Sequence, residues 1–579
     1  MYCPECGHKI EDSSMRFCPE CGTKLDDTVQ EKGNAASKED DGCSVYGIIF
    51  TNAALLARKL RRDPDEITEL LETFIRLRKQ TGVCYRLVDA GNYSFPRSGL
   101  FGRSRTISLD CSSPVEDYLE ILMDVHEREE KKGGPVSEYL FIIGGADIIP
   151  MPRIRHYLAE NSSDKTIDTD LLYAYPYSNS MISALEDMEA FGYDQMFHVG
   201  RLPLGEDAVI EDLAGYMQRL LECSGAIGIG QCYGQCDPNW KNVSATVASQ
   251  LIGSGCMRNL DGRLSDEYYY RRLILSPMVT KENVSQVLDT DADLYYFNLH
   301  GGEGAESRGY FGATAPQYGG NMYSVILPEH MMTLKKRNAV ISEACYGGKF
   351  IGLDKRRSML LASLFTNTLS FVGSSRVAWG SVDSSSNPEE SSLFAADIIA
   401  HIFIQAAIEG YDAGQSLFMA RSMLLQKSGW GDPYAALTIT EFNLYGDPAL
   451  LLFGHKPGGE KPAFKIAGKA SLAPKGSRKD NCTVERLDIN GTGASVLQQV
   501  RGAVNANIMD MHSMISQYLY SNYSVEPRKL DSAFRLKYDS GKEEILFNYK
   551  FPGNIGRIET QYTVSATADG KIQKVYTTK

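Results

Sequence analysis

The sequence contains no run of 18 or more apolar residues, which argues against a typical membrane-spanning helix. It also lacks the basic start and apolar stretch of a secretory signal, because it opens with Met1-Tyr-Cys-Pro-Glu-Cys6. We therefore expect a cytoplasmic protein. Positive charge is in deficit, since 60 Lys and Arg residues stand against 73 Asp and Glu residues, a net charge of -13. That surplus of negative charge repels phosphate backbones and argues against general nucleic-acid binding.

The remaining composition is ordinary for a globular protein, with 43% hydrophobic and 23% charged residues in a chain of 579. At about 100–200 residues per domain, this length predicts three or four units. Four of the 13 cysteines are paired near the N-terminus, and the others are scattered. In a reducing compartment we expect the scattered cysteines to be mostly small buried hydrophobes.

The first 25 residues contain two similar knuckles with the spacing C-x2-C-x11-C-x2-C. Their cysteines are Cys3, Cys6, Cys18 and Cys21. Four thiolates complete the tetrahedral coordination of zinc and leave no position open for a substrate, so the pattern predicts a structural zinc ribbon. Two disulfides or a chance repetition are the alternative. Residues 26–42 are polar and read as a linker.

From residue 44 the pattern alternates between strands and helices. Strands are expected at 45–50, 84–88 and 139–143, with helices at 63–79 and 115–130. After a helix at 211–221 the alternation repeats, with strands at 226–231, 292–299, 339–344 and 370–373 and helices at 393–408 and 413–425. This order predicts a parallel sheet with helical crossovers, built from two α/β halves, 43–222 and 223–455.

The end of the chain has a different pattern. Residues 456–480 are rich in Gly, Pro and Lys and read as a second linker. A helix is expected at 494–520 and strands at 533–539, 543–550 and 557–567. We interpret residues 481–579 as a small α+β module whose helix covers one face of its sheet.

A histidine and a cysteine follow two of the buried strands. His300 ends the first strand and precedes Gly301, and Cys345 ends the second. Catalytic groups collect beyond the carboxyl ends of parallel strands, so neighbouring strands would place both at one edge. An imidazole raises the thiolate fraction of a nearby thiol and protonates a leaving amine, and the amides of Gly301 and Cys345 could form an oxyanion hole. Taken singly, such a cysteine is usually packing and such a histidine is usually on the surface.

Six ordered segments across residues 45–455 resemble the gingipain family of cysteine peptidases, which shares a clan with caspases, legumain, separase and clostripain. They are the two strand ends above and the segments 139–150, 168–173, 198–203 and 441–448. The resemblance implies a caspase-like fold, a mainly parallel sheet sandwiched by helices, and hydrolysis of peptide bonds. Segment 371–379 resembles the family segment that lines the specificity pocket, which implies that Ser374 and Trp379 flank that pocket.

The resemblance leaves the preferred substrate residue open. Arginine gingipains hold a basic side chain with an Asp, and an ungapped alignment puts Trp240 at that position, three residues from Asp237. A preference for basic residues through Asp237 or Asp383 is therefore an expectation. Glu303 and Glu343 lie near the dyad in the sequence as candidates for a third group that orients His300.

We expect a regulated intracellular cysteine endopeptidase with few protein targets, a structural zinc ion, and a partner that binds the zinc ribbon or the C-terminal module. A defence-associated protease held inactive until a signal arrives is one form of this hypothesis. The alternatives are a catalytically silent caspase-like scaffold and a zinc-ribbon adaptor that binds protein partners.

Overall fold

The computed structural model provides the description of the fold. It describes residues 42–95, 105–156, 165–176, 195–248, 251, 274–275, 288, 290–302, 308–313, 322–382, 393–429, 432–454, 482–487, 489, 508–523, 525, 527, 530–538, 540–552, 559–567 and 570–579. The four cysteines of the predicted zinc ribbon and both predicted linkers lie outside these residues. So do Glu303 and Asp383.

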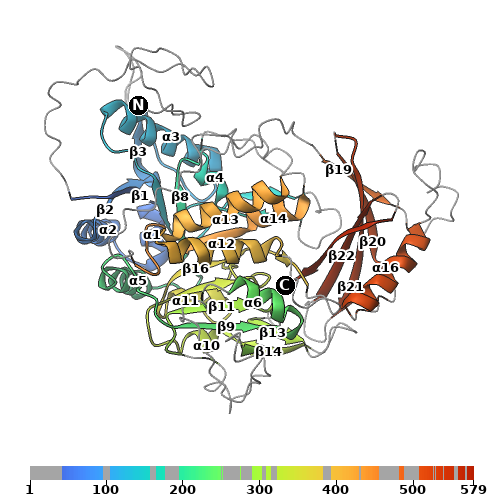
Figure 1. Cartoon of the computed structure of the whole chain (residues 1–579). Helices are drawn as coiled ribbons and strands as arrows, with labels where there is room; N and C mark the ends of the chain where they lie inside the picture. Colours follow the sequence, from blue (N-terminus) through green and yellow to red (C-terminus); the bar gives the residue numbers. More distant parts are fainter. Residues whose placement is uncertain are drawn as a thin grey trace, which may run out of the picture.

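A ten-stranded, mainly parallel sheet runs through the centre of the molecule (Figure 1). Its strands, in spatial order, are β10 (Ile274–Leu275), β9 (Cys232–Cys236), β11 (Leu294–Asn298), β15 (Asn338–Ser342), β16 (Thr368–Ser374), β18 (Phe442–Gly446), β8 (His198–Leu202), β5 (Tyr139–Ile143), β1 (Val45–Thr51) and β2 (Val83–Asp89). Only β16 and β18 pair antiparallel. The two α/β halves therefore share one sheet, and they meet where β18 pairs with β8.

Helices cover both faces of this sheet; the central strands β9, β11, β15, β16 and β18 are completely buried, whereas β2 at one side is only partly buried. They are α1 (Ala53–Leu60), α2 (Pro64–Arg78), α3 (Val115–Lys132), α5 (Ile210–Glu222), α6 (Lys241–Val247), α10 (Pro328–Met331), α11 (Met359–Leu364), α12 (Ala396–Glu409), α13 (Ala413–Ser428) and α14 (Pro433–Glu441). Successive side chains of a strand point to opposite faces. In β11, Tyr295 and Phe297 accordingly join one hydrophobic core, and Leu294 and Tyr296 join the other. The expected α/β sandwich is confirmed.

Most expected elements form, and their ends follow local chemistry. Helix α2 begins after Asp63, whose carboxylate accepts the amide of Asp65, and Pro64 occupies the first turn. Helix α3 ends at Gly133, which adopts a left-handed conformation. None of the described helices is long and apolar enough to cross a membrane.

One expected strand was wrong. Residues 226–231 are not part of the sheet, and β9 begins only at Cys232. The amides of Ile227, Gly228 and Ile229 donate instead to the carbonyls of residues 451 and 452. The Asp293 carboxylate then accepts the next two amides, from Gly230 and Gln231. Bonds to distant residues, which the local pattern does not encode, thus replaced strand pairing.

The cysteines of the described part of the chain differ in one respect from the expectation. Cys43 and Cys84, at the start of β1 and in β2, form a disulfide that the sequence analysis did not predict. Among the described cysteines outside this disulfide, Cys232, Cys236 and Cys345 are buried and Cys111 is exposed. Buried thiols behave as small hydrophobes, as expected for this scattered set.

A buried arginine connects three of the segments that resemble gingipains. Arg201 in β8 pairs with the Asp170 carboxylate at 2.7 Å. Its Nε atom also donates to Asp170, Nη1 donates to the carbonyls of Gly144 and Ile149, and Nη2 donates to the carbonyl of Pro150. A fully buried guanidinium is stable only when its donors have partners. The segments 139–150, 168–173 and 198–203 are therefore parts of one buried network.

The C-terminal module forms a six-stranded antiparallel sheet that includes a strand from the peptidase-like domain. Its order is β17 (Trp379–Gly380), β23 (Ile572–Thr578), β22 (Glu559–Thr567), β21 (Glu543–Pro552), β20 (Ser532–Tyr538) and β19 (Cys482–Leu487). Helix α16 (Ile508–Tyr523) covers one face, as expected, through Ile515 and Leu519. Strands β19 and β23 were not predicted. Because β23 pairs with β17, the end of the chain joins the larger domain (Figure 1).

Candidate active site

Three neighbouring parallel strands carry the candidate groups at their carboxyl ends. In the sheet, β11 lies between β9 and β15, with Phe297 opposite Gln235 on one side and Ser342 on the other. Each strand ends a few residues later, and the chain then presents Asp237, His300 and Cys345 at one edge of the sheet. The sequence predicted this edge for His300 and Cys345, because carboxyl ends of parallel strands lie together.

The backbones of Gly301 and Cys345 are in contact. A Cβ atom on Gly301 would overlap with the carbonyl oxygen of Cys345, so only glycine fits there. The amides of both residues point to one oxygen of the terminal residue, Lys579, at 3.5 Å from the Gly301 nitrogen and 3.3 Å from the Cys345 nitrogen. Two converging amides around one oxygen are the arrangement of an oxyanion hole.

The turn that carries Cys345 is held against β16. Tyr346 has a positive φ of 56°, which is uncommon for a residue with a side chain. Its amide donates to the carbonyl of Arg376, and the amide of Gly348 donates to Ser374. The Cys345 thiol is buried, and its sulfur lies 3.6 Å from the carbonyl oxygen of Ala378. The turn therefore places the thiol beside Ala378, whose carbonyl oxygen also accepts a hydrogen bond from the amide of Lys579.

His300 is buried between a tryptophan ring and a carboxylate. Its ring centroid lies 4.5 Å from that of Trp240, and its Nε2 atom lies 3.9 Å from the Asp237 carboxylate. Burial lowers the pKa of His300 to about 3, and the positive charge of Lys579 lowers it further in the same direction. The imidazole is thus in its neutral form at neutral pH, the form that a general base requires, while burial and the charge of Lys579 weaken it as a base.

The pKa of Asp237 is shifted in the opposite direction, upward. Burial raises its pKa to about 7, although the amides of Asn239 and Ala313 donate to its carboxylate and favour the charged form. An acid beside the imidazole is the usual third group that orients a catalytic histidine. Asp237, which was predicted to lie in the specificity pocket, lies next to His300, and the charge of Lys579 also acts on its carboxylate.

The side chain of Lys579 fills a buried acidic pocket next to this site. Its ammonium lies 2.9 Å from Asp397 and 3.5 Å from Glu343, and all three side chains are completely buried. The ammonium also lies 4.5 Å from the centroid of the Trp240 ring, within cation–π range. A buried ammonium requires such partners, because an isolated charge is costly to desolvate.

The two acids of this pocket are held in different ways. Asp397, in the first turn of α12, accepts the amide of Ser381 at 2.6 Å. Glu343 accepts the hydroxyl of Tyr296 at 2.6 Å. Burial and the neighbouring charge of Asp397 raise the pKa of Glu343 well above its ordinary value. The raised pKa favours the neutral form of Glu343, and Asp397 is the acid closer to the ammonium.

Comparison with known families agrees with this geometry. The model of peptidase family C25 matches residues 64–453, which include both strand ends and the acidic pocket. The chain belongs to peptidase family C25. Members of this family are cysteine peptidases, so the protein is a peptidase by family as well as by the arrangement of its site.

The N-terminus of this C25 peptidase matches a zinc-ribbon domain over residues 2–28. No curated protein matches the chain. Among solved structures, a protease is 9% identical with a TM-score of 0.43, covering 92% of this chain and 96% of that chain. The separase–securin complex of Saccharomyces cerevisiae is 10% identical with a TM-score of 0.31, covering 66% of this chain and 22% of that chain. The family assignment rests on the family match alone.

The other predicted pocket residues of the peptidase lie close to this site. Trp379 pairs through its backbone with Thr578, while its ring packs against Tyr434 at a centroid distance of 4.8 Å. Ser374 is buried at the end of β16, where its hydroxyl donates to the carbonyl of Arg376. Trp379 therefore borders the bound end of the chain through its backbone.

Sequence reasoning missed three groups that surround the Lys579 side chain. Asp397 lies in a helix of the second half, and nothing in its local sequence marks it. Glu343 was considered only as a candidate to orient His300, whereas it lies 3.5 Å from the Lys579 ammonium, and Trp240 was noted only as the residue at the expected acid position. One signal for the pocket was available in the sequence: Trp240 aligns with the Asp that holds the basic side chain in arginine gingipains, and its ring does lie beside the Lys579 ammonium.

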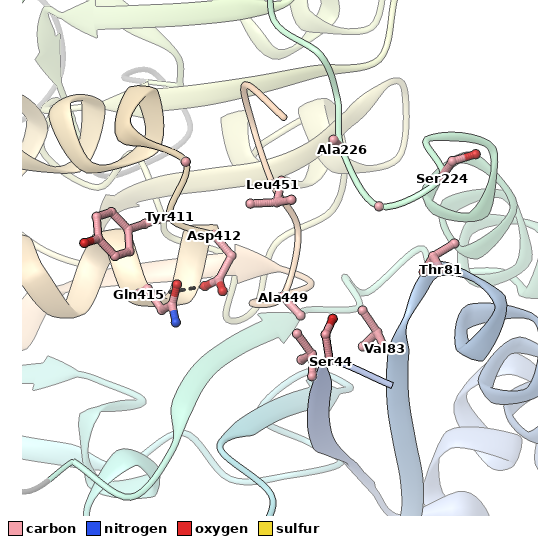
Figure 2. A pocket seen from close by; sticks show the side chains of 13 residues that line it. Ser44, Thr81, Val83, Ser224, Ala226, Tyr411, Asp412, Gln415, Ala449 and Leu451 are labelled. Atoms are coloured by element: carbon pink, nitrogen blue, oxygen red, sulfur yellow. Dashed lines mark hydrogen bonds between the residues drawn. The ribbon is translucent and has the colours of Figure 1, made fainter. Parts of the chain in front are cut away.

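Two open cavities of the described part of the chain can be compared with this site. One of about 210 Å³ borders Cys345 on the side of Tyr346, Arg308 and Lys349. The other, of about 140 Å³, lies at the opposite edge of the sheet, near Ser44 and Val83 (Figure 2). In the second cavity the Asp412 carboxylate already caps α13 through the amide of Gln415 and accepts the hydroxyl of Tyr139. Only the first cavity is part of the active-site region.

Proposed function

We propose that the protein is a cysteine endopeptidase in which His300 and Cys345 form the catalytic dyad and in which lysine is the preferred residue before the cut. One observation carries this proposal: a lysine occupies the acidic pocket while its terminal oxygen lies at the amides of Gly301 and Cys345. A substrate lysine in that position would present its carbonyl carbon to the Cys345 sulfur.

In this proposal the peptide bond is hydrolysed in two stages, acylation of Cys345 and hydrolysis of the resulting thioester. The Cys345 thiol transfers its proton to neutral His300, and the sulfur attacks the substrate carbonyl carbon. The carbonyl oxygen becomes an oxyanion that the amides of Gly301 and Cys345 stabilise. His300 returns the proton to the leaving amine as the peptide bond breaks and a thioester remains. Water, deprotonated by His300, hydrolyses that thioester and restores the thiol.

The dimensions of the pocket favour lysine over arginine. A single ammonium reaches Asp397 at 2.9 Å and stops at the Trp240 ring. A Cβ on Gly380 would overlap with the lysine side chain, so the passage into the pocket is narrow. The longer, branched guanidinium would require the tryptophan to move. We therefore propose a preference for Lys, followed by Arg, with neutral residues disfavoured by the unpaired buried acid.

A substrate library tests this preference. Peptides of identical sequence that vary only at the residue before the cut are incubated with the protein, and initial rates are compared within the library. We expect the Lys peptide to be cleaved at least ~10²-fold faster than the matched Met peptide, because Met fills the pocket without neutralising its acid. Fastest cleavage after Asp, or after an apolar residue, would contradict the proposal.

The scaffold and adaptor alternatives receive no support from the site. A silent scaffold has no need of two amides converging beside a cysteine or of a buried acidic pocket next to them. The proposed role with few targets has its support in the narrow pocket. The proposed cytoplasmic location receives no support from the Cys43–Cys84 disulfide, because disulfides are rare in that compartment. Reduction of the Cys43–Cys84 pair in the isolated native protein would support the cytoplasmic part of this proposal.

The zinc ribbon is proposed to bind one structural zinc ion through Cys3, Cys6, Cys18 and Cys21. The four thiolates fit the tetrahedral preference of zinc and would supply rigidity rather than catalysis. We expect one zinc per chain by metal analysis and its loss in the double variant Cys18→Ser, Cys21→Ser. The matched variant Cys111→Ser should keep the metal. Cleavage should stay within about twofold in both, since a closed metal site holds no substrate; zinc retained by the double variant would refute the ligand assignment.

A further inference from the structure

The end of the chain lies in the active site in the position of a bound peptide. Strand β23 pairs antiparallel with β17, with Thr578 opposite Trp379 and Thr577 opposite Gly380. The amide of Lys579 donates to the carbonyl of Ala378 at 3.0 Å. Addition of an extended segment to an exposed strand is a common way to bind peptides, because the backbone supplies the hydrogen bonds.

The side chain and the terminal oxygen of Lys579 complete this likeness. The ammonium lies in the acidic pocket between Asp397 and Glu343, and the terminal oxygen faces the amides of Gly301 and Cys345. The segment thus lies where the side chain and the carbonyl oxygen of a substrate lysine would lie. As long as it stays there, no substrate lysine can enter.

Contacts outside the cleft hold the segment in place. Lys574 pairs with Asp432 at 2.8 Å, and the Tyr576 ring lies 4.6 Å from that of Tyr434 and 4.5 Å from that of Phe394. The remaining strands of the module continue the sheet from β23. Because the segment belongs to the same chain, it competes at an effective concentration that reaches about the millimolar range for short flexible tethers.

We propose that residues 572–579 are a built-in inhibitor, which fills the substrate-binding cleft in cis with Lys579 in the place of the substrate lysine. This inference rests on the proposed function. It assigns the C-terminal module a regulatory role: the module keeps the peptidase latent, and displacement of β23 from β17 activates it. A partner that binds the module and separates these strands would release the activity.

The first test uses the native chain and carboxypeptidase B, which removes accessible C-terminal lysines. With its side chain completely buried, Lys579 should resist removal by at least ~10-fold relative to the urea-unfolded chain, followed by mass spectrometry. Equal rates of removal from the folded and the unfolded chain would overturn the proposal without reference to any peptidase activity.

The second test compares Lys579→Ala with Lys571→Ala. Lys571 is exposed in the turn before β23, so it is the matched control. In the Lys579→Ala variant we expect iodoacetamide to alkylate Cys345 at least ~10-fold faster than in the native chain. The variant should also cleave a lysyl peptide at least ~10-fold faster. Both rates of Lys571→Ala should equal those of the native chain. The free peptide Tyr-Thr-Thr-Lys should inhibit the Lys579→Ala variant, and Tyr-Thr-Thr-Ala should not.

The outcomes separate this inference from the proposed function. If Cys345 of Lys579→Ala is alkylated no faster than in the native chain, and the variant cleaves the lysyl peptide no faster, the inhibitor proposal fails. It then fails even where lysyl peptides are cleaved. If alkylation accelerates and Tyr-Thr-Thr-Lys protects Cys345 while no peptide is cleaved, the segment does occupy the cleft and the peptidase proposal fails. Should Lys579→Ala not fold, the carboxypeptidase measurement on the native chain decides.

Discussion

Replacement of Cys345 by alanine is expected to lower kcat/KM for a lysyl peptide by ~10³-fold or more, because the sulfur is the only atom that forms the covalent intermediate. His300→Ala should lose a similar factor, since no proton acceptor would remain at the thiol. The effects of replacing two residues that act as one catalytic unit do not add, so the double variant should be no slower than the slower single variant. Initial rates in the Lys579→Ala background measure this effect without the competing chain end.

Cys111→Ala is the matched control for this experiment. Cys111 is also a cysteine outside the disulfide but is exposed and lies far along the chain from the strand ends. Its replacement should leave kcat/KM within about twofold, as is usual for surface positions. Thermal unfolding of each variant shows whether the fold is retained. A Cys345→Ala variant that folds and cleaves at the native rate would refute the dyad and return the scaffold and adaptor hypotheses to consideration.

The two acids of the lysine pocket are expected to respond very differently to neutralisation. Asp397→Asn should lower kcat/KM for a lysyl peptide by ~10²-fold or more, because it removes the charge that compensates a completely buried ammonium. Glu343→Gln should cost no more than ~10-fold. Burial and the charge of Asp397 raise the pKa of Glu343, which favours its neutral form, and glutamine has the shape of that neutral form.

These variants are compared in the Lys579→Ala background, with lysyl and methionyl peptides of the same sequence. In Asp397→Asn the ratio of kcat/KM for the Met peptide to that for the Lys peptide should rise, since an apolar side chain no longer faces an unpaired charge. Asp412→Asn is the control, because Asp412 is a buried acid that caps α13 at the other edge of the sheet. Equal losses in Glu343→Gln and Asp397→Asn would show that both acids are ionised, and no loss in either would refute the lysine pocket.

Local sequence was sufficient for the elements that carry the dyad. The apolar strands at 292–299 and 339–344 and the polar residues that follow them predicted β11, β15 and their shared edge. The prediction succeeded because a buried parallel strand is recognisable from composition alone and its carboxyl end is defined by the chain direction. The same reasoning failed for residues 226–231, whose amides are satisfied by Asp293 and by carbonyls of residues 451 and 452.

The lysine pocket could not be predicted in this way. Glu343 follows β15, Asp397 lies in α12 and Lys579 is the last residue, so more than 180 residues separate the ammonium from its closest acid. Nothing local distinguishes these charges from the solvated ones that surround most helices. Strand β23 was missed for a related reason. It has no strong apolar pattern and carries a charged residue, Lys574, and it is stabilised by pairing with β17 and β22.

The sequence by itself thus determined the alternating α/β order, the positions of His300 and Cys345 at strand ends, and the glycine whose amide approaches the bound oxygen, because each depends on hydrophobic periodicity or on backbone freedom within a few residues. The tertiary structure decided the substrate pocket, the neighbour of His300 and the position of the chain end in the cleft. These depend on which distant charges are buried together, and the energy of a buried charge is set by partners that only the folded chain brings within reach.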